Sequence, residues 1–448
     1  MDEKKVRIEL SEDCFRYGTN GQVVGLRYAG VVDFLKRSPY EACSIDGSPA
    51  RRNLDNGLFL LGQTSLRSAV RECYPDVNEN DLREITSFTT DVGLPSRQRS
   101  AATLLMFENG VLDVKKYASG EKDCLRECDE TMCLTSKLPW NFNIDAACES
   151  VDKFLDDLSC GDVATRANLE ETLALALYRD RSSLQIAPFL YGPTAANGKT
   201  TLLEVLYRVL GRDNCVSLLP DDLVHEYKSS KVVGKMLVAM NDVPSDAWRS
   251  PVCSALKTMI DGSLQMGNAK YRDPSPFRNQ AVFVLTSNSL PRFPASESSG
   301  IMRRLRLVPM YGKFEPGTAG YDPGILEKVT TPEACEYWLL LAVNALIGLL
   351  ERRDMTPNVE GQKLASVTVA DNDAFLAWVE HEDINEGDLL NKVNNVVFGD
   401  YARWCLASNY RAGNINQFSR MVKTHFGLET GHKSIAGKNY RVYKKPSS

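Results

Sequence analysis

The chain has 448 residues, more than one ordinary domain holds, so we expect two or three domains. It is 43% hydrophobic and 25% charged with a formal net charge of -5, a balance typical of soluble globular proteins. Its start lacks the apolar core of a signal peptide, and no apolar run reaches the roughly 18–20 residues that a transmembrane helix needs. These features argue against a secreted or membrane protein and favour a cytoplasmic one.

Twelve cysteines are scattered along the chain, and in a cytoplasmic protein most of them are expected to be reduced and buried. One group, Cys124, Cys128 and Cys133 with Cys148 further on, raises the alternative of a structural zinc site. Zinc ligands usually come in pairs two residues apart, whereas the gaps here are three and four residues. The spacing therefore favours ordinary thiols over a metal site.

The first two regions carry no catalytic motif. Residues 1–95 have a mixed α/β pattern with turn signals, and their role stays open. Residues 96–180 begin with two short strands, within 104–114, around an Asn109–Gly110 turn. Helical patterns follow at 151–158 and 169–178. We interpret 96–180 as a helical region that precedes the next domain and contributes to oligomerisation.

The clearest motif follows a short apolar strand at 188–191. It is the turn Gly-Pro-Thr-Ala-Ala-Asn-Gly-Lys-Thr from Gly192 to Thr200, and an apolar helix at 201–210 comes next. Strand, glycine turn, Gly-Lys-Thr and helix form the context of a phosphate-binding P-loop. Backbone N–H groups of such a turn have no intrahelical partner and therefore bind phosphate oxygens. The motif predicts a P-loop NTPase domain at 181–350.

The expected ligands of this turn are ATP and Mg²⁺. Lys199 would neutralise the β- and γ-phosphates, and the Thr200 hydroxyl would ligate Mg²⁺. The residues expected to bind the nucleotide are Gly192, Ala196, Asn197, Gly198, Lys199, Thr200 and Thr201. Five residues separate Gly192 from Gly198, where four are usual. Either the loop is one residue longer, or Pro193 takes the place of the first glycine.

Two further strands should supply polar groups to the same site. A strand at 236–240 ends in Asn241 and Asp242, and we expect Asp242 to hold the Mg²⁺ shell and organise the attacking water. Asn241 can orient a water but cannot accept its proton, so the general base stays open. A strand at 281–285 leads to Asn288, which can sense the γ-phosphate. The simpler alternatives are that Asp242 is a turn residue and that Asn288 caps a turn.

A helix at 252–260 and a hairpin at 263–272 lie between these two strands. We predict a Gly267–Asn268 turn and a returning arm with Lys270, Tyr271 and Arg272. Alternating basic and aromatic side chains suit phosphate contact and base stacking. The alternative is a structural hairpin with solvated charges.

In this order, the motifs resemble those of the superfamily 3 helicases, AAA+-type ring motors of small DNA viruses, poxviruses, phages and plasmids. The similarity is closest to the phage and plasmid branch that is related to poxvirus helicase-primases. The matching segments are 197–200, 237–244, 256–262, 270–273, 286–291 and 300–305, with 107–113 and 138–140 before them.

The resemblance implies an AAA+-type P-loop core with a parallel sheet, assembled as a hexamer around single-stranded DNA. The expected DNA contacts are Lys257, Lys270, Tyr271 and Arg272, with the hairpin in the central pore. It also implies an arginine finger that acts on the neighbouring subunit, so that hydrolysis requires assembly. We favour Arg304 for this role, and Arg303 would then read the nucleotide of its own subunit.

The end of the chain is basic. A polar segment at 351–372 is interpreted as a linker to a small domain at 373–448. From 401 onward there are nine Lys or Arg and one acidic residue, which gives about +8 against -13 for the rest of the chain. Helices at 400–407 and 417–426 and a basic ribbon at 431–445 are typical of a winged-helix-like domain that binds duplex DNA. The alternative is a solvated basic surface.

Together these features predict an ATP-dependent DNA helicase in the replication of a phage or other mobile element, within the cytoplasm of a bacterial host. The alternative is a DNA-bound ATPase switch or helicase loader that does not unwind processively. A small-molecule kinase would need neither the hairpin nor the arginine pair. Residues 1–100 contain no Asp-x-Asp pair near a histidine, so a primase is expected to be a separate chain.

Overall fold

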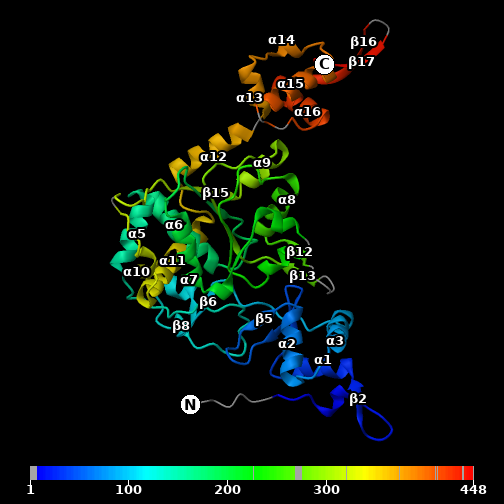
Figure 1. Ribbon diagram of the computed structural model, residues 1–448, viewed down its shortest axis with the longest axis vertical. Coiled ribbons are helices and arrows are strands. Elements are labelled where there is room, and N and C mark those ends of the chain that lie inside the picture. Colours follow the sequence, from blue (N-terminus) through cyan, green and yellow to red (C-terminus); the bar gives the residue numbers. More distant parts are fainter. Residues whose placement is uncertain are drawn as a thin grey trace.

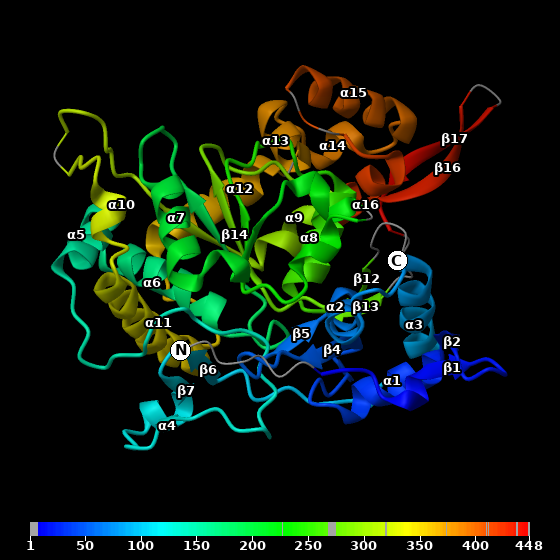
Figure 2. The ribbon, with the colours of Figure 1, turned by 60° about the horizontal axis from the view of Figure 1, so that its bottom comes forward.

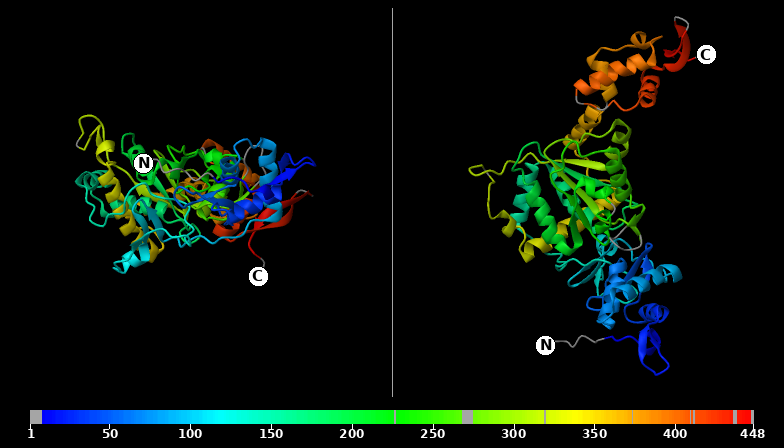
Figure 3. Two further views of the ribbon diagram at one scale, coloured as in Figure 1. Left: turned by 90° about the horizontal axis from the view of Figure 1, so that it is seen from below. Right: turned by 45° about the vertical axis from the view of Figure 1, so that its right-hand side comes forward.

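The computed structural model describes residues 8–225, 227–267, 275–318, 320–372, 374–408, 410, 412–435 and 438–446. The chain forms three regions along its long axis (Figures 1 and 3). An N-terminal α/β region and a C-terminal helical region lie at opposite ends, and a central domain with a parallel sheet lies between them. The predicted α/β fold around a parallel sheet is confirmed at this level.

The N-terminal region packs three helices beside a small antiparallel sheet. Its elements are η1 (Glu12–Cys14), β1 (Phe15–Tyr17), β2 (Val23–Leu26), α1 (Tyr28–Arg37), β3 (Cys43–Ile45), β4 (Ser48–Arg52), β5 (Phe59–Leu61), α2 (Gln63–Cys73) and α3 (Glu79–Val92). Leu35, Val70 and Leu82 belong to the core that α1, α2 and α3 share. Asp46 and Gly47 join β3 to β4 with φ of 51° and 84°. Two successive positive φ angles make the tight turn that suits the twist of a hairpin.

A connecting region of strands and helices follows. It contains β6 (Leu104–Phe107), β7 (Gly110–Asp113), α4 (Val114–Ala118), β8 (Leu125–Arg126), α5 (Glu149–Ser159) and α6 (Val163–Leu177). The two predicted strands pair, but Phe107 lies opposite Gly110, so the turn consists of Glu108 and Asn109, one residue earlier than predicted. Helix α6 is buried along most of its length and packs against α11 (Pro332–Arg352).

The central sheet has five parallel strands in the order β10-β11-β14-β9-β15. They are β9 (Ala187–Tyr191), β10 (Cys215–Ser217), β11 (Leu237–Met240), β14 (Val282–Ser287) and β15 (Leu305–Pro309). Nearly every residue of β11 and β14 is buried, as a parallel sheet covered on both faces requires. Strand β9 lies between β14 and β15, and the chain order changes direction there. Ligands bind at such switch points, beyond the carboxyl ends of the strands.

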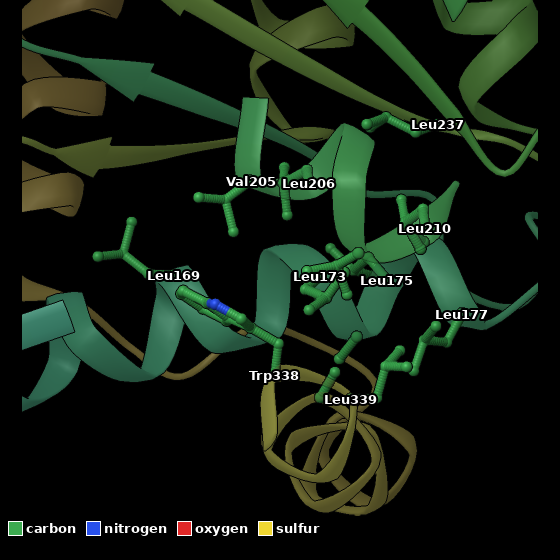
Figure 4. Packing of buried hydrophobic residues seen from close by; sticks show 14 of the residues in the cluster. Leu169, Leu173, Leu175, Leu177, Val205, Leu206, Leu210, Leu237, Trp338 and Leu339 are labelled. Carbon is green, nitrogen blue, oxygen red and sulfur yellow. The ribbon is translucent and has the colours of Figure 1, made fainter. Parts of the chain in front are cut away.

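Helices cover both faces of this sheet. On one face α6, α7 (Lys199–Leu210) and α11 share a large core, in which Leu173, Leu206 and Trp338 meet (Figure 4). On the other face, α8 (Ser250–Ile260) and α9 (Ala295–Met302) form a second core. The remaining elements are η2 (Arg212–Asn214), η3 (Pro220–Val224), η4 (Ser229–Val232), β12 (Leu264–Gly267), β13 (Ser275–Arg278) and α10 (Ile325–Lys328).

Helix α11 qualifies the expectation that no segment could cross a membrane. Its 21 residues are long and apolar enough by length and composition alone. Half of the most apolar stretch is buried inside the protein, where Trp338 and Leu346 join the core under the sheet. The core helix of a globular protein passes the same test, so α11 is weak evidence for a membrane.

The C-terminal region consists of α12 (Val359–Asn372), α13 (Ala374–His381), α14 (Glu386–Leu389), α15 (Asn394–Ala407), α16 (Ile415–Phe426), β16 (Glu429–Ile435) and β17 (Lys438–Lys444). The segment expected to be a linker is largely the helix α12, which packs on β15 and α9 (Figure 1). Gly361 lies so close to β15 that a Cβ atom there would stand 2.2 Å from the carbonyl oxygen of Leu307. This glycine permits close packing of a helix and does not mark a flexible link.

Candidate nucleotide-binding site

The turn after β9 begins at a glycine that has no room for a side chain. A Cβ atom at Gly192 would lie 1.8 Å from Nδ2 of Asn197 and 2.6 Å from the carbonyl oxygen of Met310. The N–H of Gly192 donates to the carbonyl oxygen of Ser287 at the end of β14. Gly192, and not Pro193, therefore holds the close-packed first position, and the turn has one residue more than the usual spacing.

Inside the turn, the backbone takes conformations that expose its N–H groups. Ala196 and Gly198 have φ of 57° and 81°, and Gly198 directly precedes α7. Nδ2 of Asn197 donates to the carbonyl oxygen of Thr194 at 2.8 Å, which closes the longer turn on itself. The first N–H groups of α7 have no partner within the helix, so the turn ends at a helix terminus that suits an anion.

Lys199 lies at the centre of a network of oxygen atoms. Its Nζ donates to Oδ1 of Asn197 and Oδ1 of Asn288, both at 2.7 Å, and to the carbonyl oxygen of Gly192 at 3.2 Å. The residue is only 7% exposed. Burial lowers the pKa of Lys199, and the negative charge of Asp242 partly offsets that effect. A buried ammonium held only by neutral oxygens can exchange them for phosphate oxygens.

Asn288 connects the three strands that end at this edge. While its Oδ1 accepts from Lys199, its Nδ2 donates to Oδ1 of Asp242 at 3.2 Å. Lys199 follows β9, Asp242 follows β11 and Asn288 follows β14. The structure thus brings together three of the residues to which the sequence assigned the nucleotide site.

A residue that sequence reasoning did not single out holds Asp242 in place. Thr286 is fully buried, and its Oγ1 accepts from the backbone N–H of Asp242 at 2.9 Å. The same hydroxyl donates to Oδ1 of Asn241 at 2.7 Å. Asp242 has a φ of 51°, which is uncommon for a residue other than glycine. Asn241 accepts from the Thr286 hydroxyl, and this hydroxyl in turn accepts from the backbone of Asp242, so the side chain of Asn241 helps to fix the conformation of Asp242. A hydroxyl within a buried strand was the only signal in the sequence.

Thr200 and Thr201 open onto a cavity of about 680 Å³ beside the turn. Ala196 and Gly198 line the same end of the cavity. The rest of the lining mixes apolar side chains, among them Phe154, Leu203, Tyr207, Phe314, Tyr321, Ile325 and Leu326, with the polar Asp157, Glu204, Ser217, Asn241 and Asp322. The N–H of Phe314 donates to the carbonyl oxygen of Ala196 at 2.7 Å, so this wall is tied to the turn. A concave site with aromatic and aliphatic walls and a few polar groups is typical of small-molecule sites.

The oxygen donors near this turn are of the type that Mg²⁺ prefers. Thr200 offers a hydroxyl and Asp242 a carboxylate, both exposed to solvent. Mg²⁺ usually takes only one or two protein ligands and completes its shell with phosphates and waters. These two residues fit that requirement.

The arginine pair differs from the expectation. Arg304 is 5% exposed, and its Nε and one terminal nitrogen donate to the two carboxylate oxygens of Asp261 at 2.6 and 2.5 Å. This ion pair holds the guanidinium inside its own subunit, so the structure disfavours Arg304 as the finger. Arg303 is exposed and forms no ion pair with any part of the chain that the structure describes.

Arg303 cannot read the nucleotide of its own subunit either. It precedes β15, whose first residue Leu305 pairs with Ala187 at the start of β9. The P-loop follows the other end of β9, five residues away, which is about 15 Å of strand. The arginine therefore lies at the amino edge of the sheet and the nucleotide turn at the carboxyl edge.

The hairpin is present, but its turn is not where the sequence predicts it. Gly267 of β12 pairs with Ser275 of β13, so Gly267 belongs to the outgoing strand and not to the turn. Lys270, Tyr271 and Arg272 lie outside the described residues. Lys257 on α8 is only partly exposed, and its Nζ donates to the carboxylate of Glu297 on α9 at 2.5 Å. This ion pair competes with the DNA contact that was expected of Lys257.

The cysteines form no metal site in the described part of the chain, where no group of three or more suitable side chains is found. Cys133 is buried beside Cys43, whereas Cys128 is exposed. Burial raises the pKa of Cys43 to about 12 and also raises that of Cys133. Both thiols are therefore protonated near neutral pH, which disfavours metal binding.

The C-terminal region presents its basic residues to solvent. The exposed ones are Arg403, Arg420, Lys423, Lys433, Lys438, Arg441 and Lys445. Those on α16 and on the ribbon β16–β17 lie on the two elements that the sequence assigned to duplex DNA. Two of these lysines form ion pairs, Lys423 with Glu429 and Lys445 with Glu386.

Comparisons with known proteins show that the part of the chain that holds this site is similar to a family of undefined role. Residues 190–304, which include the P-loop turn, Asp242 and Asn288, match a family of unknown function, DUF5906. None of the curated proteins matches the chain. Two solved structures of the NrS-1 C terminal region, both apo, are 13% and 14% identical to the chain. They cover 93% of it with 99% and 98% of their own length, at TM-scores of 0.47 and 0.45. The chain is thus similar to the DUF5906 family over about a quarter of its length.

Proposed function

We propose that the central domain binds and hydrolyses Mg²⁺–ATP and that the chain is an ATP-driven DNA helicase of the superfamily 3 type. The observation that carries the proposal is the double contact of Asn288 with Lys199 and Asp242. It joins a phosphate-binding lysine, a metal-binding acid and a polar sensor at one edge of a parallel sheet. In P-loop NTPases a lysine, a hydroxyl and an acid on the next strand meet in this way around the phosphates.

In this proposal the residues have separate tasks. The turn from Gly192 to Thr200 cradles the phosphates with its N–H groups, and Lys199 exchanges its present oxygen partners for phosphate oxygens. The cavity of about 680 Å³ takes the nucleoside against Phe314. Mg²⁺, held by Thr200 and Asp242, would neutralise charge that develops on the phosphates. Asn288 orients the attacking water through its amide.

The motor part of the proposal rests on three other features. An exposed Arg303 lies at the edge of the sheet away from its own P-loop, where a neighbour in a ring can use it. A hairpin, β12–β13, follows α8 and would contact one DNA strand through Lys270. The basic α16 and ribbon would bind duplex DNA. We assign the DNA to replication of a phage or another mobile element.

A second candidate is an ATPase switch or loader that binds DNA without unwinding it. The burial of Arg304 favours this alternative, because only one arginine of the pair is left to act between subunits. A switch that works as a monomer needs no such arginine. The two candidates agree on the nucleotide site and differ on assembly and strand separation.

A fork-unwinding assay with ATP separates the two candidates when ATP hydrolysis is measured in parallel with and without single-stranded DNA. A helicase unwinds the fork and hydrolyses ATP faster on DNA. A switch hydrolyses ATP but leaves the fork intact. Absence of hydrolysis under all conditions, in a protein shown to be folded, would contradict both.

A further inference from the structure

The N-terminal region contacts the central domain through a tight turn, among other places. Asp46, Gly47 and Ser48, called here the 46–48 turn, join β3 to β4 and point toward β13 (Figures 1 and 2). Oγ of Ser48 donates to the carbonyl oxygen of Pro276 at 2.8 Å, across 228 residues of sequence. Ser48 itself is only 4% exposed. A buried hydroxyl with one distant backbone partner is a specific contact.

A second contact lies four residues further along the same segment. Nε2 of Gln280 donates to Oδ2 of Asp46 at 2.9 Å, and that carboxylate oxygen also accepts from Nε of Arg99 at 2.5 Å. The ring of Pro276 lies beside Gly47, at 3.4 Å from where a Cβ atom would stand. The 46–48 turn therefore holds both ends of the segment 276–280.

The opposite side of this segment is fixed by the central domain. Phe277 is 2% exposed and belongs to the core beneath α8 and α9. Nδ2 of Asn279 donates to the carbonyl oxygens of Met259 and Ala281. Residues 276–280 thus lie between the 46–48 turn of the N-terminal region and the core of the central domain.

The position of the segment in the chain gives these contacts their meaning. Residues 276–280 lead from the returning strand of the hairpin directly into β14, and β14 ends at Thr286 and Asn288 beside Lys199. Residues 276–280 are the direct chain connection between β14 and the hairpin, so a shift of β14 when the nucleotide changes would be transmitted through them. The contacts that anchor residues 276–280 therefore determine how much of a shift in β14 is transmitted to the hairpin.

We propose that the 46–48 turn is a clamp that positions the β12–β13 hairpin relative to β14, so that the N-terminal region couples nucleotide hydrolysis to DNA contact. Ser48 and Asp46 are positioning residues in this proposal, since neither touches nucleotide or DNA. The proposal rests on the proposed function of the hairpin. It assigns a task to residues 1–95, for which the sequence offered none.

The test compares Ser48→Ala with Ser48→Thr, which keeps the hydroxyl, and with Asn20→Ala. Asn20 belongs to the β1–β2 turn of the same region, where its Oδ1 accepts from the N–H of Gln22. We expect Ser48→Ala to keep the basal ATPase rate and to lower the stimulation by single-stranded DNA about three- to tenfold. Ser48→Thr and Asn20→Ala should keep the stimulation. Backbone N–H groups of β13 should exchange faster with solvent in Ser48→Ala only.

Lys270→Ala separates failure of the clamp from failure of the proposed function. If Lys270→Ala loses DNA stimulation while Ser48→Ala keeps it, the clamp is overturned and the function of the hairpin stands. If Lys270→Ala keeps the stimulation, the assigned role of the hairpin is wrong. Hydrogen exchange in β13 then decides the clamp by itself, because unchanged exchange in Ser48→Ala overturns it.

Discussion

The two edges of the central sheet are built in different ways. At the carboxyl edge, Lys199, Asn288 and Asp242 are linked by single hydrogen bonds, and each partner can be exchanged for a ligand oxygen. At the amino edge, Arg304 is locked to Asp261 by two hydrogen bonds, and Arg99 is held by Asp46. Burial lowers the pKa of Arg99, and its neighbour Asp46 works against that effect.

The residues proposed to bind a ligand thus lie at the carboxyl ends of the strands, and residues with structural contacts lie at the amino ends of the same strands. Strand β14 begins next to Gln280, which contacts the N-terminal region, and ends next to Asn288. At the carboxyl edge, Lys199 has only neutral oxygen partners, which the proposed function replaces with phosphate oxygens. At the amino edge Arg304 and Arg99 are each paired with a carboxylate from another segment of the chain, whereas Arg303 is exposed. Mutations at the two edges should therefore fail in different ways.

The largest effect is expected at the carboxyl edge. Lys199→Ala should lower the ATPase rate about 100-fold or more, because it removes the charge that faces the phosphates. The melting temperature should stay near that of the parent, since the buried ammonium has only neutral oxygens as partners. Lys313→Ala is the matched control, an exposed lysine three residues beyond Met310. Undiminished hydrolysis in Lys199→Ala would remove the basis for the whole nucleotide site.

At the amino edge the loss should be one of stability. Arg304→Ala leaves Asp261 without its partner and should destabilise the fold by about 2–4 kcal/mol, below the full cost of a broken buried pair because Asp261 keeps some exposure. Arg303→Ala should cost less than about 0.5 kcal/mol, since its side chain is exposed. Urea unfolding measures both.

The same two variants test the arginine assignment. In an assembled ring, Arg303→Ala should lower hydrolysis while wild-type stability is kept. Suppose instead that Arg304→Ala unfolds at the urea concentration of the parent and loses hydrolysis only on assembly. The assignment made here would then be reversed, and Arg304 would be the finger.

The difference between the edges also explains what the sequence could predict. Lys199, Asp242 and Asn288 each follow a short apolar strand, so a local pattern identifies them. The partners at the amino edge lie far apart in the chain, as do Arg304 and Asp261, and no local pattern reveals that they meet. For this reason the sequence alone could not show that Arg304 forms a buried ion pair whereas Arg303 stays exposed.

Two other errors have the same origin. The hairpin turn was placed at Gly267–Asn268 from a dipeptide signal, but pairing of Gly267 with Ser275 depends on how β13 packs against the core through Phe277. The polar character of 351–372 suggested a linker, although Gly361 within it serves the packing of α12 on β15. Local sequence signals indicate which conformations a segment favours by itself, whereas contacts with distant residues determine the conformation in the folded protein.

A smaller effect is expected in the cavity next to the P-loop. Phe314→Ala removes an aromatic wall and should weaken binding of a fluorescent ATP analogue about tenfold, as loss of about 1.4 kcal/mol of contact would. Tyr311→Ala is the control, an exposed aromatic residue outside the lining of the cavity. Equal affinities of the two variants for the ATP analogue would contradict the proposed contact between the nucleoside and Phe314.

The smallest effect expected is the pH dependence of folding stability that arises from Lys199 at the carboxyl edge. The pKa of Lys199 is lowered by burial, so the folded protein loses this proton at a lower pH than the unfolded chain does. Stability should therefore rise slightly with pH between the two pKa values, below the ordinary 10.5 of lysine.

Nucleotide affinity should change in the opposite direction, because the neutral amine no longer attracts phosphate. Titration of the ATP analogue against pH in the alkaline range measures this decline. Lys199→Arg keeps its charge throughout that range and should flatten the curve. An identical decline in Lys199→Arg would place the titrating group outside the lysine and its oxygen partners.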